Sequence, residues 1–202
     1  MTPVKAHTPD LAVRLVDEAG RILSAEGATA LTLRRLATRT GTSTMAVYTL
    51  FGDKQGLLAA MYREGYARLG AALEAATEGY DDPLTALAAQ GMAYRETALA
   101  NPHLYDLMFG RPVPGFVPDP AAQEAADAAY RPLVDAVQRC LDTGQIVGGD
   151  AERIALHLWA ISHGMVSLEL AGHLAGDAAA REAAYRDALA YSSVAFLPPL
   201  SS

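Results

Sequence analysis

The stretch LTLRRLATRTGTSTMAVYTLFGDK, residues 31–54, decides the fold of the first part of the chain. Its spacing predicts two short helices, over 33–40 and 44–50, joined by a turn at Gly41. Thr32 stands where a hydroxyl caps the first helix, and Ser43 or Thr42 stands where one caps the second. Two capped helices around a glycine form a helical hairpin of defined geometry.

A helix-turn-helix motif makes specific demands on such a hairpin, and this stretch meets them. Ala37 is small enough for the two helices to approach closely, and glycine at position 41 tolerates a positive φ. Leu36, Val47 and Leu50 or Phe51 are placed to close a small core. An ordinary helical hairpin with capping hydroxyls is the alternative, but the complete spacing favours the helix-turn-helix.

The rest of the chain also has the periodicity of helices. Alanine fills 41 of 202 positions, strand-favouring residues are sparse, and no credible strand stands out. Apolar spacing and helix-start signals predict further helices over about 9–26, 54–78, 83–100, 102–109, 120–143, 151–174 and 178–197. We therefore expect an all-α protein of about nine helices.

The charge of the chain is unevenly divided between its two parts. Residues 1–56 carry seven basic and five acidic side chains, whereas residues 57–202 carry nine basic and eighteen acidic ones. A mildly basic first part on an acidic body indicates that only the first part contacts a polyanion, although charge also fluctuates along any chain. Tyr48 and Lys54 are suited to phosphate, and Thr44 and Met45 to base edges.

The same residues resemble a known family. Residues 31–37, Gly41, residues 47–54 and the pair Leu57-Leu58 are similar to the signature of the TetR family of bacterial regulators, and residues 10–62 fit it without a gap. The resemblance implies a DNA-binding domain over residues 1–53, a helical effector-binding and dimerisation domain over residues 54–202, and a homodimer. It places DNA contacts on Thr32, Thr42, Ser43, Thr44, Met45, Tyr48, Thr49 and Lys54. Leu50 departs from the residues common in the family, so we assign it to packing.

The second part of the chain resembles one subgroup of that family. The run Leu158-Trp159-Ala160-Ile161-Ser162-His163-Gly164 is similar to the Trp-His-Gly signature of that subgroup, and residues 104–109 are similar to a second segment of it. An effector pocket between helices would use the aromatic and polar side chains of this part. The predicted pocket residues are Tyr94, Tyr105, Met108, Phe109, Phe116, Trp159 and His163. For any one of them a plain core position is the alternative.

The last two predicted helices have apolar faces beyond the needs of one core. The family resemblance implies that they pack against their copies as a four-helix bundle. The predicted dimer-interface residues are Leu156, Leu168, Leu189, Val194 and Phe196.

Other functions find little support in the sequence. The one cysteine, Cys140, lacks a nucleophile motif, and the five histidines lack the spacing of metal ligands, so we expect no metal, no cofactor and no catalysis. No apolar run is long enough to span a bilayer and residues 1–11 do not form a signal peptide, so we expect a cytoplasmic protein without membrane contact.

These observations together predict a ligand-responsive transcriptional regulator that binds double-stranded DNA. The expected form is a repressor that a small, mostly apolar effector releases from a palindromic operator. An enzyme on a helical scaffold and an architectural DNA-binding protein without a ligand are the alternatives.

Overall fold

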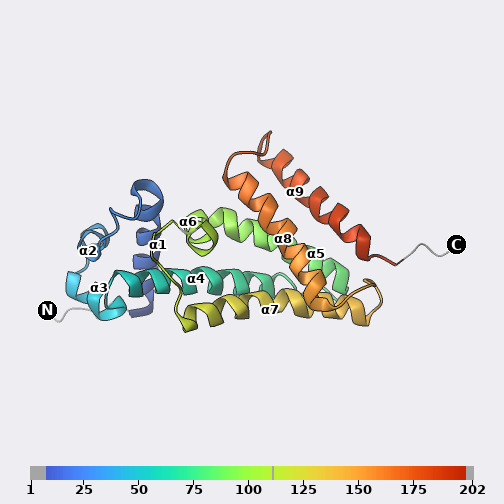
Figure 1. Ribbon diagram of the computed structural model, residues 1–202, viewed down its shortest axis with the longest axis horizontal. Coiled ribbons are helices and arrows are strands. Elements are labelled where there is room, and N and C mark those ends of the chain that lie inside the picture. Colours follow the sequence, from blue (N-terminus) through green and yellow to red (C-terminus); the bar gives the residue numbers. More distant parts are fainter. Residues whose placement is uncertain (1–7, 111, 199–202) are drawn as a thin grey trace. The chain divides into compact units, whose positions relative to one another are not determined.

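The computed structural model describes residues 8–110 and 112–198, and nine α-helices form the framework of these residues (Figure 1). A π-helical turn, η1 (Asp106–Gly110), extends α6, and a 3-10 turn, η2 (Val194–Phe196), follows α9. No strand occurs among the described residues, which confirms the all-α prediction. The α-helices are α1 (Thr8–Glu26), α2 (Leu33–Thr40), α3 (Thr44–Phe51), α4 (Lys54–Ala75), α5 (Pro83–Ala100), α6 (Pro102–Tyr105), α7 (Pro120–Asp142), α8 (Ala151–Leu170) and α9 (Ala178–Ser193).

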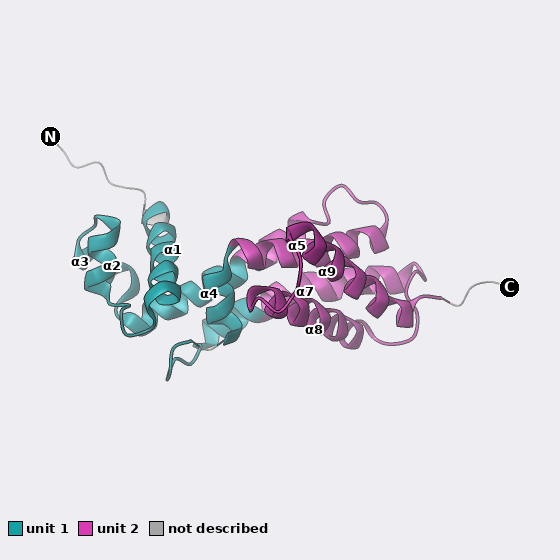
Figure 2. Ribbon diagram, turned by 90° about the horizontal axis from the view of Figure 1, so that it is seen from above, with its two compact units in different colours: residues 1–67, 101–126 teal, residues 68–100, 127–202 magenta. Residues whose placement is uncertain are grey.

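Two compact units divide the chain (Figure 2). Unit 1 holds residues 1–67 and 101–126, and unit 2 holds residues 68–100 and 127–202. The helices α4 and α7 run from one unit into the other, whereas the boundary predicted from the sequence falls between residues 53 and 54, where α4 begins.

Capping residues start the helices at the predicted positions. The hydroxyl of Thr32 accepts a hydrogen bond from the Arg35 amide at the start of α2, and that of Ser43 accepts one from the Ala46 amide at the start of α3. Asp150 and Asp177 cap α8 and α9 in the same way. Each cap pairs a backbone N–H that the helix cannot use itself, so the sequence fixes these helix starts locally.

Unit 1 is built around α1. Leu15, Ala19 and Ile22 of α1 are fully buried or nearly so, and they belong to one core with Leu36 of α2 and Val47 of α3. Gly41 closes α2 with φ of 67°, and its turn places α3 across α2. The core therefore fixes the orientation of α3 within unit 1.

Within unit 1, α6 and η1 pack closely against two glycines. A Cβ atom at Gly20 of α1 would lie 1.9 Å from the His103 ring, and one at Gly65 of α4 would lie 2.5 Å from the Met108 sulfur. Only glycine permits so close an approach at these two positions. The short helix is thus seated against α1 and the first part of α4.

Unit 2 packs α5, α7, α8 and α9 around its own core. The fully buried side chains include Val137 and Cys140 of α7 and Ala155 of α8, and Tyr185 of α9 is also fully buried. The Tyr185 hydroxyl donates a 2.7 Å hydrogen bond to the carbonyl of Gly91 in α5. A Cβ atom at Gly91 would lie 2.7 Å from Leu189, so this glycine allows α9 to approach α5 closely.

Candidate functional site

The outer face of α3 carries large side chains that are exposed. Met45 is 74% exposed and Tyr48 is 51% exposed, although both are large side chains, and the Thr49 side chain is also exposed. Val47, between them, is fully buried. The helix therefore presents one apolar face to its own domain and leaves the opposite face available for a partner.

The predicted DNA-contact hydroxyls also serve the local fold. Thr32 and Ser43 cap helices through their oxygens, so their hydroxyl protons remain able to donate to a phosphate. The Thr49 hydroxyl donates a 2.9 Å hydrogen bond to the Met45 carbonyl, which leaves it an acceptor. Thr42 and Thr44 are partly buried at the turn. All eight predicted contact residues lie in unit 1 between α2 and the start of α4.

Most arginines of the helix-turn-helix region are neutralised within unit 1. Glu18 accepts hydrogen bonds from Arg21 at 3.0 Å and Arg39 at 2.8 Å, and Arg35 pairs with Glu26. Burial acts to raise the pKa of Glu18, but the hydrogen bonds and charges of Arg39 and Arg21 outweigh it and lower the pKa below its ordinary value. Glu18 therefore stays ionised and holds the two arginines on α1 and α2.

Two other cations of this region differ in their availability. Arg34 at the start of α2 is exposed, and its guanidinium makes no ion pair or hydrogen bond to any described residue. The Lys54 ammonium instead donates a hydrogen bond to the carbonyl of Ala28 and is partly buried. The sequence predicts a phosphate contact for Lys54 and does not distinguish Arg34 from its neighbours, since the ion pairs of the neighbouring arginines are not visible in the sequence.

The seven predicted pocket residues are divided between the two units. Tyr94, Trp159 and His163 lie in unit 2, where the Tyr94 hydroxyl is 3.3 Å from His163 Nδ1 and the Trp159 ring packs on Tyr130 at 5.6 Å between centroids. Burial lowers the pKa of His163 below its ordinary value, so the neutral imidazole is favoured. The other four lie in unit 1. They are Tyr105, Met108, Phe109 and Phe116.

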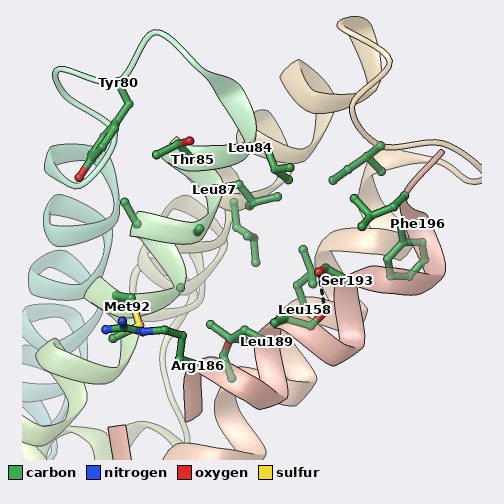
Figure 3. A pocket seen from close by; sticks show the side chains of 18 residues that line it. Tyr80, Leu84, Thr85, Leu87, Met92, Leu158, Arg186, Leu189, Ser193 and Phe196 are labelled. Carbon is green, nitrogen blue, oxygen red and sulfur yellow. Dashed lines mark hydrogen bonds between the residues drawn. The ribbon is translucent and has the colours of Figure 1, made fainter. Parts of the chain in front are cut away.

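Unit 2 contains a cavity of about 470 Å³ with a different lining (Figure 3). Its walls come from α5, α8 and α9, with one residue each from α7 and from the segments before α5 and α8, and with Phe196 of η2 and the following Leu197. None of the seven predicted pocket residues lines it. The lining residues are Tyr80, Leu84, Thr85, Leu87, Ala88, Ala89, Gly91, Met92, Leu133, Ile146, Leu158, Ser162, Arg186, Leu189, Ala190, Ser193, Phe196 and Leu197.

The five predicted dimer-interface residues separate into two groups. Leu156 is 55% exposed, Leu168 is 44% exposed and Val194 is 62% exposed, so these three side chains are accessible to a partner. Leu189 and Phe196 are partly buried and line the cavity instead. The helices α8 and α9 thus have an exposed apolar face and a face turned into unit 2.

Neither a metal centre nor a membrane span is found in the described part of the chain. No three His, Cys, Asp or Glu side chains converge there in a way that would hold a metal ion. No helix of residues 8–110 and 112–198 has the length and hydropathy that crossing a bilayer requires. Burial raises the pKa of the Cys140 thiol above its ordinary value, which disfavours the reactive thiolate.

Two solved structures are similar to this chain over most of its length. A protein of unknown function from Rhodococcus sp. RHA1 is 33% identical, with a TM-score of 0.76 over 95% of this chain and 100% of that one. A TetR family transcriptional regulator from Thermus thermophilus is 22% identical and shares the fold, with a TM-score of 0.68 over 94% of this chain and 100% of that one.

Sequence comparison assigns the family. An HTH-type transcriptional regulator of Mycobacterium tuberculosis is 26% identical in a match that covers 81% of this chain and 82% of the relative. The family model described as "Bacterial regulatory proteins, tetR family" matches residues 15–61, and the one described as "Tetracyclin repressor-like, C-terminal domain" matches residues 87–191. The Trp-His-Gly subgroup stays a prediction. The protein therefore belongs to the TetR family of transcriptional regulators, dimeric proteins with a DNA-binding domain and a ligand-binding domain.

Proposed function

We propose that this protein is a repressor that a small, mostly apolar effector releases from a palindromic operator. The exposed face of α3 carries the proposal, because Met45 and Tyr48 have no structural reason to be in water. A methionine and a tyrosine with neighbouring hydroxyls can contact base edges, thymine methyl groups and phosphates of a major groove. Thr44, Met45, Tyr48 and Thr49 are the proposed contacts of α3.

The phosphate contacts of the proposal come from the residues that flank α3. Thr32, Thr42 and Ser43 would donate from the helix starts and the turn, and Lys54 from the start of α4. Arg34 joins this set because it is exposed and unpaired among the described residues. A free guanidinium can bind a phosphate through two parallel hydrogen bonds, in bidentate geometry. A guanidinium that is paired with a carboxylate must first break that ion pair.

The palindrome follows from the proposed dimer. A two-fold symmetric protein that places one α3 helix in each of two major grooves reads two half-sites about one helical turn apart. Leu156, Leu168 and Val194 are exposed apolar side chains on α8 and just after α9, which supports a dimer through these helices. Leu189 and Phe196 face the cavity, so their part in the interface is the least supported.

Effector response follows as a shift between two dimer arrangements. A ligand that binds the arrangement with the wrong α3 spacing lowers the affinity for DNA, and DNA lowers the affinity for that ligand by the same factor. Three of the residues predicted from the sequence as pocket residues lie in unit 2, namely Tyr94, Trp159 and His163. In unit 1, the proposed moving element is α6 with η1.

Footprinting and gel-shift experiments on the DNA upstream of the chain's own gene test the proposal. We expect two protected half-sites about one helical turn apart, lower transcription from that promoter with the protein present, and release by an apolar ligand. A single unsymmetrical site, or higher transcription on binding, would contradict the palindrome or the repressor role respectively.

A further inference from the structure

The cavity of unit 2 is formed by side chains that recur at helical spacing on three helices. Leu84, Leu87 and Ala88 of α5 are followed one turn later by Gly91 and Met92. Leu158 and Ser162 lie one turn apart on α8, and α9 contributes Arg186, Leu189, Ala190 and Ser193. Figure 3 shows the α5 side chains and the α9 side chains on opposite sides of the space. One face of each helix is therefore committed to this cavity.

The cavity opens at the surface of unit 2 and extends into its core. Tyr80 and Leu197 on its walls are 50% and 39% exposed, whereas Leu87, Ile146 and Ser162 are at most 8% exposed. Three other exposed apolar residues of unit 2, Leu156, Leu168 and Tyr191, do not line it. A volume of about 470 Å³ with mostly aliphatic walls lies within the range of small-molecule sites. A small molecule is therefore the occupant that this shape suits.

One buried polar group in the wall has no partner among the described residues. Ser162 is 6% exposed, and its hydroxyl makes no hydrogen bond to any of them. A serine within a helix either bonds back to the carbonyl four residues earlier or leaves its hydroxyl open, and the Ser162 hydroxyl does not bond back. The hydroxyl can both donate to and accept from a bound molecule.

Three of the other polar groups of the lining are already engaged. The Thr85 hydroxyl donates to the Asp82 carboxylate, and that of Ser193 donates to the Ala190 carbonyl at 2.8 Å. Arg186 is paired with Glu182 at 2.7 Å, and its side chain is 66% exposed, so its charge is balanced by Glu182 and hydrated. Tyr80 is half-exposed, in the segment before α5. The wall thus offers one buried hydrogen-bonding position in apolar surroundings.

We infer that this cavity binds the effector of the proposed function, and that the effector is a neutral, largely apolar molecule with one polar group on the Ser162 hydroxyl. That the bound molecule acts as an effector rests on the proposed function. The cavity is lined by Leu158 and Ser162, which lie on a different face of α8 from Trp159 and His163, so it replaces the pocket that was predicted around those two residues. The ligand contacts α9 directly through Leu189 and Ala190.

Fluorescence titration of the full-length protein with N-phenyl-1-naphthylamine tests the cavity without DNA. This probe is neutral and apolar and has a single N–H donor. We expect saturable binding of one probe per protomer. Ala88→Trp on α5 and Ala190→Trp on α9 abolish it, because both alanines are exposed and an indole there fills the cavity without disturbing the core. Ala128→Trp, an exposed alanine of unit 2 outside the lining, is the matched control and retains binding.

The Ser162 contact is tested with two probes that differ in one group. Ser162→Ala should lower the affinity for N-phenyl-1-naphthylamine by about fivefold, which corresponds to the loss of one neutral hydrogen bond. The same change leaves 1-phenylnaphthalene, which lacks the N–H, bound equally well or more tightly. An equal loss for both probes would show that Ser162 supports the wall and does not contact the ligand.

The outcomes separate the cavity from the regulatory function. Absence of saturable probe binding, or undiminished binding in both tryptophan variants, overturns the inference. DNA affinity measured on the same variants remains at the wild-type value if the cavity is separate from DNA recognition. Probe binding as described, with no apolar ligand able to release DNA, would uphold the site and contradict the ligand response.

Discussion

The guanidinium of Arg95 in α5 donates two hydrogen bonds of 2.8 Å to the carboxylate of Glu169 in α8, and both side chains are only 6% exposed. Glu169 also accepts from Arg181 of α9 at 3.3 Å, so the carboxylate joins three helices. Arg95 further lies over the Tyr185 ring, 5.9 Å from its centroid. This ion pair therefore holds together the three helices that form the walls of the cavity.

Removing the carboxylate leaves a buried charge, so Glu169→Gln should lower the free energy of unfolding by about 3 kcal/mol. The remaining acid near Arg95 is Glu182 at 3.7 Å, which is 43% exposed and cannot replace the two hydrogen bonds. Urea unfolding at one fixed protein concentration measures the change. Glu182→Gln is the control and should cost less than about 1 kcal/mol. Equal losses in the two variants would contradict the special role of Glu169.

The same pair predicts how stability depends on pH. Hydrogen bonds from Arg95 outweigh burial and hold the pKa of Glu169 below its ordinary value of 4.5. The unfolded chain then binds the proton more readily, so the contribution of Glu169 is complete above about pH 4.5 and is lost as pH falls through the lower folded pKa. The free energy of unfolding of wild type should fall more steeply below pH 4.5 than that of Glu169→Gln. If the free energy of unfolding fell equally steeply with pH in the two proteins, carboxylates other than Glu169 would cause the loss of stability in acid.

Arg34 and Arg21 provide a matched test of DNA contacts. Arg34→Ala should weaken binding to all DNA sequences and lower the slope of log affinity against log salt by about 0.9, because a phosphate contact disappears. Arg21→Ala removes the same charge from unit 1 but one already paired with Glu18, so its slope should change less. Titrations at several salt concentrations measure both slopes. The same slope for the two variants would exclude a direct phosphate contact by Arg34.

Lys54→Ala should have two separable effects. The loss of a phosphate contact would lower the salt slope by about 0.9, and the loss of the hydrogen bond to Ala28 would also lower the melting temperature. Lys54→Arg keeps the charge and should retain the slope. A lower melting temperature with an unchanged slope would confine Lys54 to a structural role.

The apolar face of α8 provides a test of the dimer. Leu168→Glu and Leu156→Glu should yield folded monomers in sedimentation, because these exposed side chains are not needed within unit 2. Leu189→Glu should instead destabilise unit 2, since Leu189 packs closely over Gly91 beside the cavity. Dimers that persist in both α8 variants would place the interface elsewhere.

The sequence predicted the helix-turn-helix because its requirements are local. Thr32, Gly41 and Ser43 act through their own neighbouring backbone, and Leu36 and Val47 are fully buried as their spacing predicts. The predicted helix over 102–109 is present, but only Pro102–Tyr105 is α-helical, and η1 completes it with π-helical geometry. Periodicity alone cannot distinguish these two kinds of turn.

The cavity was not predictable in the same way. Leu158 and Trp159 are neighbours in the chain, and the large aromatic side chain was the more conspicuous pocket wall. Trp159 packs on Tyr130, whereas Leu158 lines the cavity. Which face of α8 is turned to α5 depends on contacts such as that of Arg95 with Glu169, which join residues 74 positions apart. The sequence does contain small residues in α5, namely Ala88, Ala89 and Gly91, which indicate that another helix can pack closely against α5.

If α3 recognises the DNA, wild type and Met45→Glu should differ in the affinity of the full-length protein for its own upstream DNA. Met45 is 74% exposed, so a carboxylate there should repel the DNA and lower the affinity by at least about tenfold, the effect of a single lost base contact. Ala121→Glu adds the same charge at an exposed position of α7 in unit 1 and should bind within about twofold of wild type. Wild-type affinity in Met45→Glu, or equal losses in both variants, would contradict DNA recognition through α3.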